Sequence, residues 1–168
     1  MPSSLNLHPA KWNLIVAAAP QQLLVAIAHL AHATELIVLD CGRRFDSSIV
    51  ARAARGRPEI INRIKVQRAF ICSEAVKLLE KTPTGRTPIL VLDFLSTFYD
   101  ENVKLHTRRF LLESSIKHFQ RLSQGAGLVV TVQACPVEDE LCQRLQTVAP
   151  QVSMYETQQS RTEQLSLF

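Results

Sequence analysis

Short apolar runs alternate with longer amphipathic stretches along almost the whole chain. The runs are of the length and composition expected for buried strands. Strands are predicted at residues 13–18, 36–40, 64–69, 89–94 and 128–132, with a short edge strand at 152–155. The stretches between them predict helices at 20–33, 47–55, 73–80, 107–123 and 138–148.

Local signals mark several of these helix ends. Pro20 stands at the first helical position, where its missing N–H has no intrahelical partner to lose. Ser73 is the expected N-cap of the third helix, which stops before Pro83 and Gly85. The fourth helix ends at Gly125.

The alternation of strands and helices predicts an α/β fold. The run at 89–94 is almost entirely apolar, as expected for a central parallel strand covered on both faces. Right-handed crossovers then give a doubly wound, mainly parallel sheet in three layers. We expect one domain over residues 1–155, followed by a flexible tail over 156–168 that has too few apolar groups to fold by itself.

Composition indicates a soluble protein. Hydrophobic residues make up 46% of the 168 positions and charged residues 20%. Polar residues interrupt the apolar region 14–39, so it does not predict a membrane span, and residues 1–10 carry no secretory signal. The four cysteines form no Cys-x-x-Cys pair, which favours reduced core thiols over disulfides or zinc ligands. We expect a cytoplasmic protein.

Four segments resemble RecA-like recombinases, in the family's order and spacing. They are residues 39–46 with 50–54, 66–70 leading into 78–79, 89–99 and 128–133. The third segment is similar to the Walker B strand, and the fourth to the strand that ends in a nucleotide-sensing glutamine, here Gln133. The resemblance implies a RecA-like core, truncated because few residues follow Gln133.

The chain departs from this family at the residues that handle ATP. The family has Gly-x-x-x-x-Gly-Lys-Ser/Thr after the first strand, whose backbone amides, lysine and hydroxyl hold the phosphates and magnesium. Residues 17–23 have no glycine, lysine or hydroxyl, and Cys41-Gly42-Arg43 replaces the family's glutamate after the second strand. Asp93 keeps the Walker B carboxylate, which we expect to cap nearby backbone amides. We therefore predict no ATP hydrolysis, no catalytic residue, no metal and no cofactor.

Positive charge is concentrated in one segment. The net charge is only +4, yet residues 43–68 hold eight basic side chains and two acidic ones. Candidate contacts to DNA phosphates are Arg43, Arg44, Arg52, Arg55 and Arg57. The alternative is a solvated basic face or a patch that meets an acidic partner.

The last five residues form the motif that says most about function. Gln164-Leu165-Ser166-Leu167-Phe168 closes the polar tail. It resembles the motif by which bacterial replication and repair proteins bind the DNA polymerase sliding clamp. The resemblance implies a hydrogen bond from the glutamine and burial of both leucines and the phenylalanine. The alternative is an edge strand or a plug that folds back onto its own domain.

Taken together, the two resemblances predict a non-catalytic accessory protein of bacterial DNA repair, recombination or translesion synthesis. It is similar to the RecA-related partner in ImuA-type translesion polymerase assemblies, or to a shortened recombinase paralogue. The implied partners are the sliding clamp, a translesion polymerase or recombinase subunit, and DNA. Two alternatives remain: an interaction module without clamp contact, and an NTPase with a degenerate phosphate loop.

Overall fold

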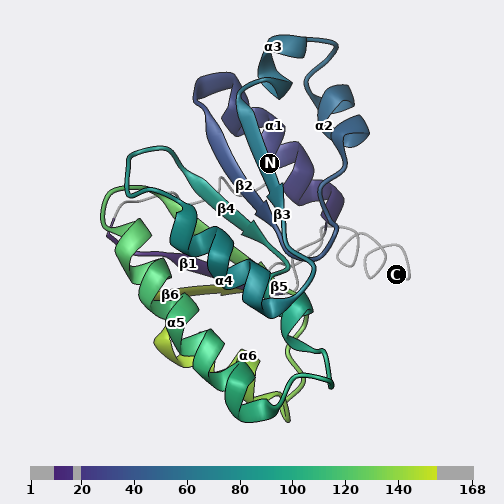
Figure 1. The fold of residues 1–168 in the computed structure, drawn as a ribbon. Helices are drawn as coiled ribbons and strands as arrows, with labels where there is room; N and C mark the ends of the chain where they lie inside the picture. The colour runs from purple at the N-terminus through teal and green to yellow at the C-terminus, as the bar shows by residue number, and fades with distance from the viewer. Residues whose placement is uncertain (1–9, 17–19, 155–168) are drawn as a thin grey trace, which may run out of the picture.

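The computed structural model describes residues 10–16 and 20–154. Within them, six strands form one sheet, in the order β3-β2-β4-β5-β1-β6, and every pair of neighbours is parallel (Figure 1). The strands are β1 (Asn13–Val16), β2 (Leu36–Asp40), β3 (Ile64–Arg68), β4 (Ile89–Leu92), β5 (Leu128–Val132) and β6 (Gln151–Met154). The predicted parallel α/β fold is confirmed.

Helices cover both faces of this sheet, as a doubly wound fold requires. On one face lie α1 (Pro20–Ala33), α2 (Ser47–Ala53) and α3 (Pro58–Ile61). On the other lie α4 (Cys72–Lys81), the 3₁₀ helix η1 (Phe94–Phe98), α5 (Leu105–Ser123) and α6 (Glu140–Val148). Figure 1 shows α4, α5 and α6 in front of the sheet and α1 behind β2 and β3.

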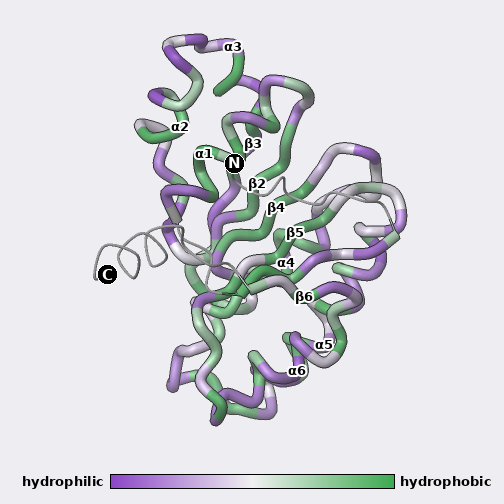
Figure 2. The backbone as a smooth tube through the Cα atoms, turned by 180° about the vertical axis from the view of Figure 1, so that it is seen from behind, coloured by the Kyte–Doolittle hydropathy of each residue, from purple (hydrophilic) through white to green (hydrophobic). Residues whose placement is uncertain are grey.

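Each central strand contributes to two hydrophobic cores, because successive side chains point to opposite faces. On β4, Ile89 and Val91 pack toward α4 and α5, whereas Leu90 and Leu92 pack toward α1. All four are fully buried, which explains the uninterrupted apolar run (Figure 2).

Aromatic packing fills the core beneath α5. The Phe119 ring lies 5.1 Å from that of Trp12 and 5.0 Å from that of Phe94, between ring centroids. Phe98 adds a further contact to Phe94 at 5.0 Å. This cluster fixes η1 against α5, and therefore fixes the residues that follow β4 at the edge of the sheet.

The short elements and helix ends differ from the sequence-based expectation. The sequence did not indicate α3 or η1. Strand β4 ends at Leu92, because Asp93 adopts a left-handed backbone with φ 51°. Ser73 is not the N-cap of α4: the helix begins at Cys72, and Ile71 occupies the cap position without a side-chain hydrogen bond.

The cysteine prediction is wrong for two of the four residues. Cys135 and Cys142 form a disulfide, with Cα atoms 5.8 Å apart, joining the segment after β5 to α6. Spacing could not reveal this pair, because the intervening turn brings the two residues together. Cys41 and Cys72 are buried free thiols, as predicted.

Several predictions fall outside the described residues. These are the phosphate-loop positions 17–19, the end of the last predicted strand at residue 155 and the whole tail 156–168. Among the described helices, none is long and apolar enough to cross a membrane.

Candidate functional site

Because all six strands are parallel, the residues that follow their carboxyl ends meet at one edge of the sheet. Asp40 is the last residue of β2, and the loop 41–45 follows it. Ala69 and Phe70 follow β3, Asp93 follows β4, and Gln133 follows β5. This carboxyl edge is where such a fold binds ligands, and it holds most residues that the resemblance singles out.

The Asp40 side chain organises the loop after β2. Its buried carboxylate accepts hydrogen bonds from the backbone N–H groups of Gly42 at 3.3 Å, and of Arg44 and Phe45 at 2.9 Å each. The Nε atom of Arg68 lies 3.6 Å from the same carboxylate. These contacts compensate the burial of the charge and fold the loop into a tight turn.

This turn places Arg44 on Asp93. The Nε atom of Arg44 donates to Oδ2 of Asp93 at 3.1 Å, and the Nε2 atom of Gln133 donates to the same oxygen at 3.1 Å. The backbone N–H of Asp93 donates to Oγ1 of Thr131 at 2.9 Å. We call Arg44, Asp93 and Gln133 the carboxyl-edge latch, because they tie together residues that follow β2, β4 and β5.

Gly42 is required by the close approach of Asp93. A Cβ atom at position 42 would lie 2.2 Å from Oδ2 and 2.5 Å from Cβ of Asp93. Both distances are far inside van der Waals contact, so a larger residue would displace the carboxylate from Arg44. The absence of a side chain at Gly42 therefore allows the latch to form.

The latch determines what Asp93 can do chemically. The expectation that Asp93 caps local backbone amides is wrong, because its side chain makes no capping hydrogen bond and holds Arg44 and Gln133 instead. Asp40 is the strand-end carboxylate that caps amides. One oxygen of Asp93 is thus already in contact with a cation, where a magnesium-binding carboxylate needs an open coordination position.

In the described ranges 10–16 and 20–154, no group of three or more His, Cys, Asp or Glu side chains is arranged to hold an ion. The Cys41 thiol is also inert at this edge, because burial and the charges of Asp40 and Asp93 raise its pKa to about 12.

The five arginines proposed for DNA do not converge on one place. Arg44 is engaged in the latch, and the guanidinium of Arg43 lies 5.0 Å from the centroid of the Phe70 ring. Arg52, Arg55 and Arg57 are exposed along α2 and the turn to α3, leading away from the carboxyl edge. Among the residues that the structure describes, these three form no ion pair.

The remaining basic residues of this segment include two that serve the fold. Arg63 donates to the carbonyl oxygens of Ala31 and His32 at the end of α1, at 3.1 and 2.9 Å. Arg68 donates to the carbonyl oxygen of Phe45 at 3.1 Å, besides its contact with Asp40. The basic density seen in the sequence is therefore partly structural.

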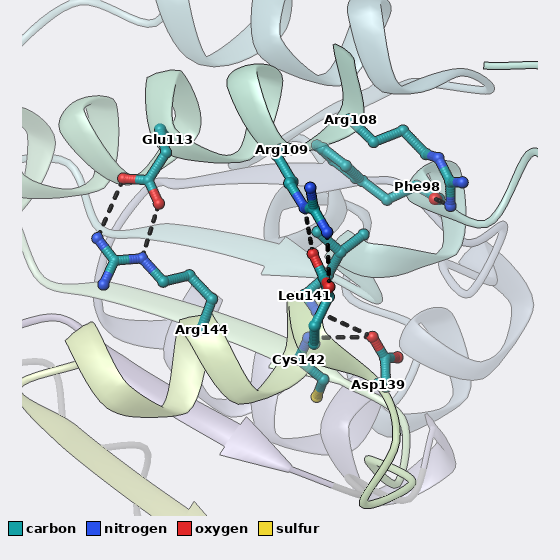
Figure 3. A network of polar contacts seen from close by, with 9 residues as sticks. Phe98, Arg108, Arg109, Glu113, Asp139, Leu141, Cys142 and Arg144 are labelled. Atoms are coloured by element: carbon teal, nitrogen blue, oxygen red, sulfur yellow. Dashed lines mark hydrogen bonds and ion pairs between the residues drawn. The ribbon is translucent and has the colours of Figure 1, made fainter. Parts of the chain in front are cut away.

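A second polar network joins α5 to α6 (Figure 3). Arg144 donates to Glu113 through Nε at 2.7 Å and a terminal nitrogen at 3.2 Å, and Arg109 contacts both carboxylate oxygens of Glu140. Hydrogen bonds from the arginines lower the pKa of both carboxyl groups. Both pairs are exposed, so they orient α6 more than they stabilise it.

Comparisons with known proteins assign the chain to no family. No protein-family model and no curated protein sequence matches the chain. Among solved structures, the chain is similar to a DnaB-like replicative helicase, described with its interactions with primase. The identity is 14% and the TM-score 0.43, over 76% of this chain and 39% of the helicase chain. The chain thus spans less than half of that protein's length.

Sequence reasoning found some of these residues and missed others. It identified Arg44, Asp93 and Gln133 separately, but not that they touch. It missed Asp40 and Phe70. The signals were visible, because Asp40 directly follows the apolar run of the second strand and the aromatic Phe70 follows the third strand. The clamp-binding candidates Gln164, Leu165, Ser166, Leu167 and Phe168 lie outside the described residues.

Proposed function

We propose that this protein is a non-catalytic, RecA-related accessory factor of bacterial DNA repair, recombination or translesion synthesis, recruited to the sliding clamp by Gln164–Phe168. The main observation that supports a non-catalytic role is the carboxyl-edge latch. Arg44 occupies the Asp93 carboxylate that the resemblance assigns to magnesium. Residues 17–23 contain no glycine, lysine or hydroxyl group that would hold the phosphates of a nucleotide, and this supports the same conclusion.

Recruitment rests on the tail motif. Its five residues match the preferred clamp-binding form, and the polar residues 156–163 would act as a tether. Burying a leucine or phenylalanine contributes roughly 1.5–3 kcal/mol, less the cost of ordering the tail. Micromolar affinity follows, which suffices when a second contact to DNA or a polymerase adds avidity.

DNA is the second contact that we propose, through Arg52, Arg55 and Arg57. Their exposure and lack of carboxylate partners among the described residues support this choice. Such binding would be salt-dependent and independent of sequence. A translesion polymerase or recombinase subunit is the expected protein partner.

The decisive experiment is a titration of the full chain with the bacterial sliding clamp. Replacing Leu167 and Phe168 by alanine should weaken binding by about 100-fold or more, because at least about 3 kcal/mol of apolar burial is lost. Thr162→Ala, in the tail but outside the motif, is the matched control and should bind as the wild type does.

Two results would refute the proposal. Unchanged clamp binding by the double variant would show that the tail is not the anchor, and would favour an interaction module without clamp contact. A micromolar dissociation constant for ATP with magnesium, measured by calorimetry on the same wild-type preparation, would refute the non-catalytic assignment and favour a degenerate NTPase.

A further inference from the structure

A small cavity opens at the carboxyl edge beside the latch. Its volume is about 230 Å³, and it lies between the loops after β2 and β3 and the helix η1. The lining residues are Cys41, Gly42, Arg43, Ala69, Phe70, Ser96 and Thr97. This volume is enough for one side chain of a partner, but small for a whole nucleotide.

Arg43 is held over this cavity in an unusual conformation. Its backbone is left-handed, with φ 55°, a region that bulky residues rarely adopt and that clusters at functional sites. Its guanidinium stacks on Phe70, and no carboxylate pairs with it in the part of the chain that the structure describes. Among the described residues, the Arg43 guanidinium is therefore a positioned cation whose hydrogen-bond donors have no partner.

Exposed apolar side chains surround the same edge. Phe70 is 55% exposed, Ile71 45% and Tyr99 51%. Exposed aromatics combined with arginine are typical of the centre of a protein interface. The cavity, the Arg43 guanidinium and these exposed apolar side chains thus belong to one surface.

The charged residues around the cavity favour a protein over a nucleic acid as its ligand. Arg44 and Arg68 are already paired with Asp93 and Asp40, so they offer little to a phosphate. Glu74 accepts a hydrogen bond from the backbone N–H of Phe70 at 2.9 Å. Burial is the main cause that raises the pKa of Cys72, and the charge of the nearby Asp100 raises it further. A DNA strand would carry repeated negative charges past these carboxylates, whereas a single carboxylate could reach Arg43 alone.

We propose that this cavity docks a loop of a protein partner that presents one carboxylate side chain beside an apolar residue. The carboxylate is held by Arg43, with the exposed hydroxyl of Ser96 as a further donor. The apolar neighbour packs on Phe70 and Ile71. This surface deepens the proposed accessory role, but it lies in the folded core and does not depend on the tail.

The test is an NMR titration of the isotope-labelled full chain with a dipeptide probe, N-acetyl-Asp-Phe-amide. We expect millimolar binding and shifts of the backbone amides lining the cavity, 41–43, 69–70 and 96–97. The uncharged analogue N-acetyl-Asn-Phe-amide should bind at least about tenfold more weakly, because it loses the charge-assisted hydrogen bond.

Arg43→Asn provides the variant, because asparagine tolerates the left-handed backbone while removing the guanidinium. It should fold normally and lose the aspartyl dipeptide. Arg86→Asn is the matched control: it makes the same charge change at an exposed position just before β4, and it should leave binding unchanged.

The proposal is overturned by any of three results. The first is a wild-type titration that leaves the cavity amides unshifted. The second is equal binding of the aspartyl and asparaginyl dipeptides. The third is a short oligothymidylate that shifts these amides and competes the dipeptide away, which would assign the surface to nucleic acid. None of these results involves Gln164–Phe168, so the clamp proposal is tested separately.

Discussion

Gly42→Ala is the most direct perturbation of the carboxyl-edge latch. The added methyl group would lie 2.2 Å from Oδ2, 2.5 Å from Cβ and 2.6 Å from Cγ of Asp93. Because Asp93 Cβ is attached to the backbone, the clash cannot be relieved by a rotation of the carboxylate alone. The chain must shift at the end of β2 or β4, and Asp93 must move away from Arg44.

Two costs contribute to the expected loss of stability. Overpacking of a tight site costs about 1–3 kcal/mol. Losing the hydrogen bond from Arg44 adds about 1 kcal/mol, the low end for a charged pair, because the arginine side chain is 39% exposed. The sum, about 2–4 kcal/mol, is a large share of the about 5–15 kcal/mol that stabilises a typical domain. It should lower the melting temperature by about 5–15 °C.

Calorimetry or circular dichroism would measure this change against two further variants. Gly85→Ala is the control, because nothing lies within 4 Å of a Cβ built there, and it should stay within about 0.5 kcal/mol of the wild type. Asp93→Gly removes all three clashing atoms and suits the left-handed backbone at position 93. Gly42→Ala should therefore cost little in the Asp93→Gly background. If it costs as much there as in the wild type, the contact with Asp93 is not its cause.

Two further predictions follow from buried or partly buried titratable groups. Burial and the charge of Arg121 lower the pKa of His118 below its ordinary 6.5. The contribution of His118 to the free energy of unfolding should therefore be full above pH 6.5 and be lost as the pH falls below it. Urea titrations at several pH values should show a weaker pH dependence of the free energy of unfolding in His118→Gln. Cys41, with its pKa raised to about 12, should exist as thiolate at a fraction of only about 10⁻⁴ at pH 8, and should resist alkylation in the folded chain. Mass spectrometry showing rapid native labelling of Cys41 would contradict its burial.

The sequence predicted the layers of the fold because those signals are local. An apolar run such as 89–94 and the helical spacing of Leu112, Ile116 and Phe119 each depend on residues close along the chain. The missed elements are short: α3 has four residues and η1 five, too few for periodicity to appear. The disulfide between Cys135 and Cys142 was missed because spacing alone does not fix the turn between them.

The candidate site was harder to predict, because its contacts join residues that are distant in sequence. Arg44 is 49 positions from Asp93, and Gln133 is 40 positions from it. Only the strand order, which places β2 and β5 on either side of β4, brings the three together. The resemblance identified each position, but it could not show that the arginine turns toward the aspartate.

Asp40 and Asp93 illustrate why the local pattern was insufficient. Both directly follow an apolar strand run that ends in leucine, so the local sequence does not distinguish the roles of the two carboxylates. Asp40 stays in the strand, and its carboxylate meets the amides of its own loop. Asp93 instead turns left-handed, toward the gap that Gly42 leaves open. A single backbone angle and a missing side chain thus separate a residue that shapes a loop from one that binds an arginine.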